Sequence, residues 1–236
     1  MTAILFAFAH PDDETFATGG TVARYAPAGV VLACATRGEA GRVTAMPGAS
    51  REEVGRVREE ELRAAAAVLG VREVDVLGFA DGGLAETDPD ALTGALVRVI
   101  RRHRPAVVVT FGPEGAPTGH VDHRAISRAA TAAYFLAGIE TSFPRAGAPH
   151  RARRLFYFTW ETPRPGDELQ LHGLPPDVHV ATGPWREAKW RAFLAHESQR
   201  HHEVRFRAIT LDRDEFFALA SGVPVREGSD DLLAGL

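Results

Sequence analysis

Two short segments of the chain place histidine beside carboxylates, a combination that can bind a metal ion. The first is His10-Pro11-Asp12-Asp13-Glu14, directly after a short apolar stretch. An imidazole next to two carboxylates offers the nitrogen and oxygen ligands that zinc accepts in catalytic sites with three protein ligands and one water. The alternative is an ordinary helix start, in which Asp12 or Asp13 caps free amide groups. A further ligand from another segment would favour the metal site.

The second segment can supply that ligand. His120, Asp122 and His123 follow the turn 112–119, again just beyond an apolar stretch. At a helix start, residues three apart share a face, so both imidazoles could look into one cavity. One imidazole could complete the metal shell. The other, made more basic by a neighbouring carboxylate, would be free to donate a proton or to stabilise an oxyanion.

The elements that must position these segments follow from the alternation of short apolar runs with longer stretches of helical period. This alternation predicts an α/β fold with a mostly parallel sheet. We expect strands at 4–8, 30–35, 74–77, 106–111, 155–160 and 178–181. We expect helices at 15–25, 50–69, 90–102, 122–137 and 184–200. Because ligands of open parallel sheets bind beyond the carboxyl ends of the strands, both His/Asp segments should lie at one edge.

Local signals refine these elements. Ser50 and Glu53 form a capping box at a helix start, and Gly70 provides the stop. The aromatic and aliphatic residues of 206–219 are expected to form a final apolar cap, and 228–236 a loose terminus.

Composition sets the class of protein. The 236 residues, 45% apolar and 25% charged, fit one globular domain spanning 1–236. A net charge of −4 argues against nucleic acid as a partner, and the single cysteine, Cys34, excludes an intrachain disulfide. The first eight residues have no cationic region and meet charged residues at once, so we expect no signal peptide, no membrane span and a cytoplasmic location.

Several motifs, taken in order, resemble the LmbE-like or PIG-L family of zinc-dependent de-N-acetylases. The resemblance rests on HPDDE at 10–14, TRGEAG at 36–41, GFADGG at 78–83, GHVDH at 119–123, and Lys189 with HESQ at 196–199. It implies a Rossmann-like fold with the metal site at the C-terminal ends of the strands. It also implies hydrolysis of N-acetyl groups, commonly on N-acetylglucosaminyl conjugates.

The resemblance assigns roles to the two His/Asp segments. It makes His10, Asp13 and His123 the ligands of one zinc ion per chain. It leaves Asp12 as the general base and His120 as the group that stabilises the tetrahedral intermediate or protonates the departing amine. A carboxylate near a zinc-activated water can take its proton. Two histidines and one carboxylate would also suit Fe²⁺ or another divalent ion, but the resemblance favours zinc.

Three further residues are implied. Asp122 matches the partner of His120, Arg58 matches an arginine that grips the substrate, and Asp81 matches an acid that binds sugar hydroxyls. For Arg58 the alternative is a solvated helix face rich in arginine–glutamate pairs. For Asp81 the alternative is an ordinary Asp-Gly-Gly turn.

The leading hypothesis is therefore removal of acetate from an amino-sugar conjugate. An amidase that cleaves a larger thiol-sugar amide at the same zinc site would differ mainly in walls formed by 140–177. A non-catalytic sugar- or dinucleotide-binding module is disfavoured, because the first turn lacks G-x-G-x-x-G and carries negative charge where a pyrophosphate would sit. His196 is expected to support the pocket structurally. Family members often form oligomers, so a homo-oligomer is an option.

Overall fold

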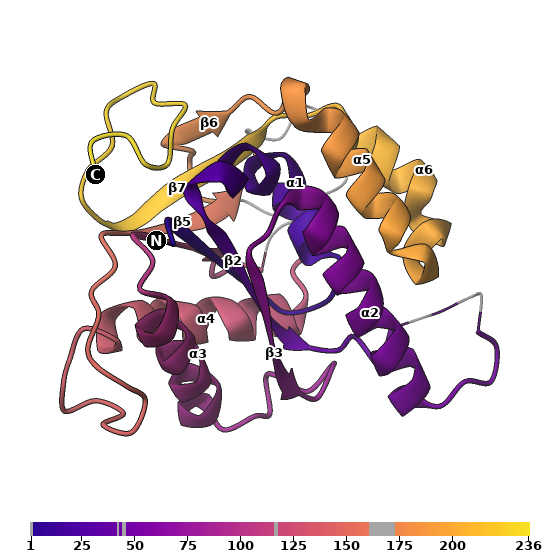
Figure 1. Ribbon diagram of the computed structural model, residues 1–236, viewed down its shortest axis with the longest axis horizontal. Coiled ribbons are helices and arrows are strands. Elements are labelled where there is room, and N and C mark those ends of the chain that lie inside the picture. The colour runs from indigo at the N-terminus through magenta and orange to yellow at the C-terminus, as the bar shows by residue number, and fades with distance from the viewer. Residues whose placement is uncertain (1, 42, 44–45, 116–117, 161–172) are drawn as a thin grey trace.

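The protein is built on one seven-stranded sheet with helices on both faces (Figure 1). The computed structural model describes residues 2–41, 43, 46–115, 118–160 and 173–236. The strand order is β3-β2-β1-β4-β5-β7-β6. The strands are β1 Ile4–Phe8, β2 Val30–Thr36, β3 Glu73–Phe79, β4 Val107–Phe111, β5 Arg154–Thr159, β6 Val178–Val180 and β7 Glu215–Gly222. The first five pair in parallel, whereas β7 runs antiparallel to both of its neighbours.

The helices form two groups, one on each face of the sheet. They are α1 Asp13–Tyr25, α2 Arg51–Leu69, α3 Pro89–His103, α4 Val121–Leu136, α5 Arg186–Ala195 and the short α6 Glu203–Phe206. Helices α3 and α4 pack together, and α1, α2 and α5 pack together on the opposite face (Figure 1). None of the helices in the described ranges is both long and apolar enough to cross a membrane.

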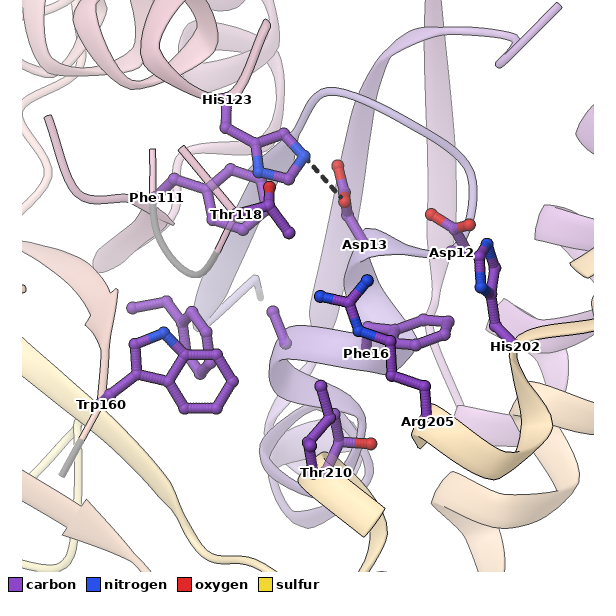
Figure 2. Close-up of a pocket in the computed structure, with 13 residues that line it drawn as sticks. Asp12, Asp13, Phe16, Phe111, Thr118, His123, Trp160, His202, Arg205 and Thr210 are labelled. Atoms are coloured by element: carbon purple, nitrogen blue, oxygen red, sulfur yellow. Dashed lines mark ion pairs between the residues drawn. The ribbon is translucent and has the colours of Figure 1, made fainter. Parts of the chain in front are cut away.

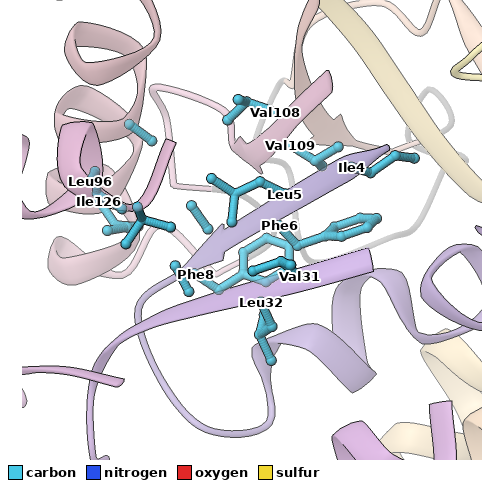
Figure 3. Packing of buried hydrophobic residues seen from close by; sticks show 14 of the residues in the cluster. Ile4, Leu5, Phe6, Phe8, Val31, Leu32, Leu96, Val108, Val109 and Ile126 are labelled. Atoms are coloured by element: carbon cyan, nitrogen blue, oxygen red, sulfur yellow. The ribbon is translucent and has the colours of Figure 1, made fainter. Parts of the chain in front are cut away.

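The centre of the core is the trio β2, β1 and β4, which Figure 3 shows with their packed side chains. Every residue of these three strands is buried. A parallel strand covered on both faces needs apolar side chains on both sides, which explains the nearly continuous apolar runs. The central strands therefore form a rigid base from whose ends the loops emerge.

The expected strands are all present, within one or two residues at each end. The capping box of α2 is confirmed, since Ser50 and Glu53 bond reciprocally, and Gly70 ends the helix with a positive φ of 77°. The helix expected at 184–200 is shorter. It ends at Ala195, because His196 leaves the helical region (φ −81°, ψ 66°), and a 3-10 helix, η3, follows at Glu197–His202.

Two expectations for the C-terminal part need correction. The expected apolar cap contains a strand, β7, which inserts between β5 and β6. The expected loose terminus is anchored. Arg154, 1% exposed, donates to the carbonyls of Val223, Pro224, Leu232 and Ala234, and the Leu232 side chain is fully buried.

Candidate metal centre and active site

The two His/Asp segments meet at the carboxyl edge of the sheet. The first lies where β1 leads into α1 and includes the first residues of that helix, and the second lies at the start of α4, after β4, the neighbour of β1. The turn after β3 adds Asp81. Three βα junctions thus bring their side chains together, as expected for an open parallel sheet.

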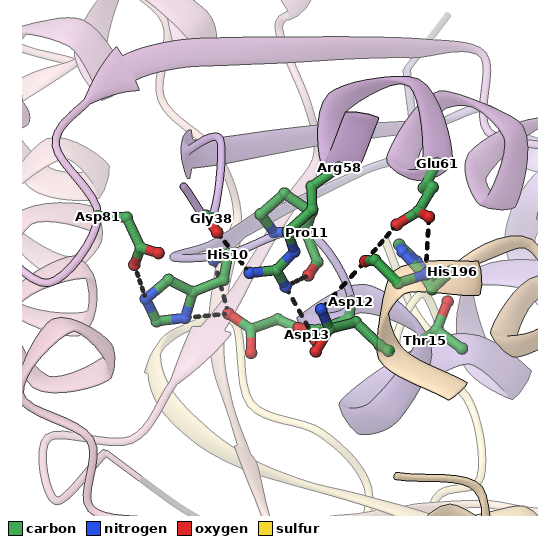
Figure 4. A network of polar contacts seen from close by, with 12 residues as sticks. His10, Pro11, Asp12, Asp13, Thr15, Gly38, Arg58, Glu61, Asp81 and His196 are labelled. Atoms are coloured by element: carbon green, nitrogen blue, oxygen red, sulfur yellow. Dashed lines mark hydrogen bonds and ion pairs between the residues drawn. The ribbon is translucent and has the colours of Figure 1, made fainter. Parts of the chain in front are cut away.

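His10 lies at the centre of this cluster. Its Nε2 is 3.1 Å from Oδ1 of Asp81 and 3.2 Å from Oδ2 of Asp122, and its Nδ1 is 3.5 Å from Oδ2 of Asp13. Figure 4 shows His10 between Asp81 and Asp13. Burial alone would lower the pKa of His10, but hydrogen bonds to the three carboxylates outweigh burial and raise that pKa well above its usual value.

Asp13 bridges the two segments. Its Oδ1 is 3.2 Å from Nε2 of His123, and its Oδ2 accepts the backbone N–H groups of Ala9 and His10. Burial opposes ionisation, yet the two histidines beside it lower the pKa of Asp13 far below its usual value. The His123 ring stacks on Phe111 with centroids 4.0 Å apart, so its orientation is fixed (Figure 2).

Asp12 points to the other side of the same turn. It has a left-handed backbone conformation, with φ 110°, which is rare for a residue other than glycine. Its carboxylate forms an ion pair of 3.1 Å with Arg58, and its N–H donates to Glu14. Desolvation raises the pKa of Asp12 to about 6, although the charge of Arg58 pulls it down. Asp12 is thus a carboxylate poised to accept a proton near neutral pH.

Arg58 is buried, 4% exposed, so the solvated helix face weighed for it is wrong. Its guanidinium donates to the carbonyls of Pro11 and Gly38 as well as to Asp12. Gly38 has φ +67°, and a Cβ there would lie 2.3 Å from Nη1 of Arg58. The glycine-containing loop after β2 therefore closes directly around this arginine. A contact between Arg58 and substrate stays a prediction.

Buried contacts of Glu14 support the turn that carries Asp12. Oε1 of Glu14 accepts from Nε2 of His196 at 2.7 Å and from the Thr15 hydroxyl at 2.6 Å. Oε2 of Glu14 accepts the Asp12 N–H at 3.0 Å. Burial would lower the pKa of His196, but the Glu14 charge and hydrogen bond raise it. The sequence placed His196 in a supporting role, and the structure identifies Glu14 as its partner.

Asp122 and His120 are in contact through the Asp122 backbone, while the Asp122 carboxylate has other partners. The Asp122 carboxylate accepts from the N–H groups of Gly82 and Leu84 and contacts His10, so it joins the start of α4 to the turn after β3. His120 is exposed, and its Nδ1 accepts the Asp122 N–H at the helix start. Burial and the positive charges of His10 and His123 lower the pKa of His120.

The side chains fit a metal ion in number and chemistry. Ring nitrogens of His10, His120 and His123 lie within 4.8 Å of one another, and Asp13 lies between His10 and His123. Donor atoms of His10, Asp81 and Asp122 also lie within 4.8 Å of one another. Imidazole and carboxylate donors converging at a buried edge are the ligand set of zinc and similar divalent ions.

A cavity of about 150 Å³ opens beside these groups (Figure 2). Asp12, Asp13 and His123 line one end. Its other described walls come from Phe16 and Ala17 on α1 and from segments outside that helix, namely Phe111, Thr118, Phe158, Trp160, His202, Arg205, Ile209 and Thr210. Buried apolar side chains beside a carboxylate base lower the local dielectric around a reacting group.

The stretch 140–177, expected to form pocket walls, is only partly described. Phe158 and Trp160 from this stretch line the cavity. Residues 161–172 lie outside the described residues, so the expectation for them stays a prediction.

A family model described as GlcNAc-PI de-N-acetylase, PIG-L, matches residues 5–134, which carry both His/Asp segments. The chain belongs to the PIG-L family. A 1D-myo-inositol 2-acetamido-2-deoxy-alpha-D-glucopyranoside deacetylase of Rhodococcus opacus is 37% identical, over 83% of this chain and 81% of that protein. A probable N-acetyl-alpha-D-glucosaminyl L-malate deacetylase 2 of Bacillus cereus is 36% identical, over 53% of this chain and 58% of that protein.

A solved structure supports the same fold. The conserved protein TT1542 from Thermus thermophilus superimposes with a TM-score of 0.75 and 30% identity, covering 96% of this chain and 98% of that one. The PIG-L fold therefore extends over almost the whole chain, beyond the part that the family model matches.

Sequence reasoning missed two parts of this PIG-L site. Glu14 belongs to the first motif, but an acidic residue at a helix start gives no sign of a distant partner. The cavity wall around His202, Arg205 and Ile209 was also missed. No periodicity in the sequence could show that the segment after α5 returns to the end of β1.

Proposed function

We propose that this chain is a zinc-dependent hydrolase that removes the N-acetyl group from an N-acetylglucosamine-type conjugate. The observation that carries the proposal is Asp13 lying between His10 and His123, with Asp12 beside them in the lining of a cavity. The family membership and the activities in the names of its relatives support the same reaction class. In this proposal His10, Asp13 and His123 hold one zinc ion per chain.

Zinc in this position would supply Lewis acidity toward the amide carbonyl and toward water. Asp12 accepts a proton from the water that attacks the carbonyl carbon. His120 donates a proton to the nitrogen as the C–N bond breaks, so that the products are acetate and the free amine. Asp81 and Asp122 fix the His10 ring through its Nε2.

For the substrate we propose two binding residues and a chemical class. Arg58 and Asp81 stay predicted substrate-binding residues, although both are engaged with neighbours inside the protein. The substrates named for the two deacetylase relatives share the glucosaminyl group and differ in the group attached to it. An amino-sugar conjugate is therefore the proposed substrate class. A cytoplasmic location, a single domain and self-association stay predictions.

The test pairs metal content with product release. The purified protein is analysed for metal, and acetate release from N-acetylglucosaminyl-inositol and N-acetylglucosaminyl-malate is measured before and after chelation. We expect about one zinc per chain and acetate release that chelation abolishes and added zinc restores. Bound zinc without acetate release from either conjugate would contradict the deacetylase, and failure to bind any divalent metal would contradict the whole site.

A further inference from the structure

Asp12 is held in a backbone conformation that it would not adopt unaided. Its φ of 110° and ψ of −26° belong to the left-handed region, and it is one of few such residues other than glycine in the described chain. Strained conformations of this kind persist only where the surrounding structure enforces them.

Glu14 provides the main-chain contact. Its Oε2 accepts the Asp12 N–H at 3.0 Å, which fixes the turn two residues back. Its Oε1 accepts from Nε2 of His196, 2.7 Å away and 182 positions later in the chain. Both side chains of this pair are almost fully buried, at 1% and 0% exposed. A buried carboxylate that loses its partner is strongly destabilised, so Glu14 depends on His196 to stay in place.

The segment that carries His196 is fixed to the neighbouring helix α2. Two residues later, the N–H and hydroxyl of Ser198 both donate to the Glu61 carboxylate, on α2. The same helix carries Arg58, whose guanidinium binds the Asp12 carboxylate (Figure 4). Asp12 is therefore held at its backbone through Glu14 and at its side chain through Arg58.

We propose that the buried Glu14–His196 pair is a positioning device for the base Asp12. The proposal rests on the role given to Asp12 above. His196 is fully buried behind Glu14 and is not among the described residues that line the cavity, so it acts through the turn and not on the reacting atoms. Loss of the pair should let the turn relax and move the Asp12 carboxylate away from its working position.

The test compares His196→Leu with a matched control, Lys189→Met. Lys189 and Glu215 form a buried ion pair of 2.7 Å, both 2% exposed, and Glu215 also accepts N–H groups of Gly20 and Thr21. This second pair thus supports the same helix, α1, away from Asp12. Both variants should have a lower free energy of unfolding than wild type, but only His196→Leu should have a lower kcat.

The three variants His196→Leu, Lys189→Met and His196→Gln should differ in kcat. His196→Leu should lower kcat about 10- to 100-fold, the effect of a misplaced catalytic group, while KM and zinc content stay close to wild type. Lys189→Met should keep kcat per folded molecule. His196→Gln, whose amide can still donate to Glu14, should recover part of the lost kcat. Equal kcat losses in the Leu and Met variants, wild-type kcat in His196→Leu, or no recovery in the Gln variant would each overturn the proposal.

A second readout separates this proposal from the proposed reaction. Amide hydrogen exchange of the peptide covering residues 9–14 should accelerate in His196→Leu and stay slow in Lys189→Met, whether or not an amide substrate is hydrolysed. If wild type hydrolyses no amide but the exchange result holds, the reaction is wrong and the positioning device stands. If the amides of residues 9–14 exchange at the same rate in both variants, the Glu14–His196 pair does not position Asp12.

Discussion

At the scale of single residues, two adjacent carboxylates have opposite surroundings. Asp13 faces two imidazoles, which hold its pKa far below the usual value, whereas desolvation raises the pKa of Asp12 to about 6. A permanently ionised carboxylate suits a metal ligand, and one that can exchange a proton near neutral pH suits a base. The turn between β1 and α1 thus places two different functions on neighbouring residues.

This division predicts opposite consequences for two substitutions. Asp12→Asn should keep about one zinc per chain and lose about 10²- to 10⁴-fold in kcat, because it removes a proton acceptor but no ligand. His123→Ala should lose the metal, since only His10 and Asp13 of the proposed ligand set would remain. Metal analysis and acetate release on both variants check this. Loss of zinc in Asp12→Asn would reverse the assignment of the two carboxylates.

His120 is the exposed member of the cluster, and burial together with neighbouring positive charges lowers its pKa. Because His120 is the proposed proton donor and is not one of the proposed ligands, His120→Ala should retain zinc and slow turnover by about 10²- to 10⁴-fold, the range for a positioned acid. The measurement is kcat for acetate release with zinc content as the control. Activity equal to wild type would remove His120 from the reaction.

At the scale of elements, α2 connects the fold to the site because it carries both Arg58 and Glu61. Its start is fixed by the Ser50–Glu53 capping box. Ser50→Ala should lower the free energy of unfolding by about 1 kcal/mol and the melting temperature by roughly 2–4 °C. Because Ser50 is exposed and lies about two helical turns before Arg58, kcat should not change. Calorimetry with an activity assay distinguishes the two effects.

The contact between α1 and the junction of α5 with η3, made by Glu14 and His196, should depend on pH. The folded pKa of His196 is raised by Glu14, so the pair stabilises the protein fully below the ordinary histidine value of about 6.5 and loses this contribution as pH rises through the folded pKa. Urea unfolding of wild type and His196→Leu at pH 6 and pH 9 checks this. The stability advantage of wild type should shrink at the higher pH, and an advantage that grows would show that His196 is neutral in the folded state.

At the scale of the whole molecule, Arg154 ties the last residues to the sheet. Its guanidinium donates to four carbonyls of 223–234. Arg154→Met should lower the free energy of unfolding by about 3 kcal/mol or more, because these carbonyls lose charged donors in a buried setting. The exposed neighbour Arg153 is the matched control, and Arg153→Met should have little effect in urea unfolding. Equal midpoints for the two variants would refute a structural role for the anchored terminus.

The parallel part of the sheet and the position of the two His/Asp segments at the carboxyl ends of its strands are predicted from the sequence alone. Those features are local, since apolar runs, capping residues and the order of His and Asp types lie within a few positions of one another. The tertiary structure alone decided what those residues contact. The insertion of β7, the anchoring of 228–236 by Arg154, the contact of Asp122 with His10 and the Glu14–His196 pair all join segments far apart in the chain. Such contacts depend on three-dimensional packing, which leaves no periodic signal in the sequence.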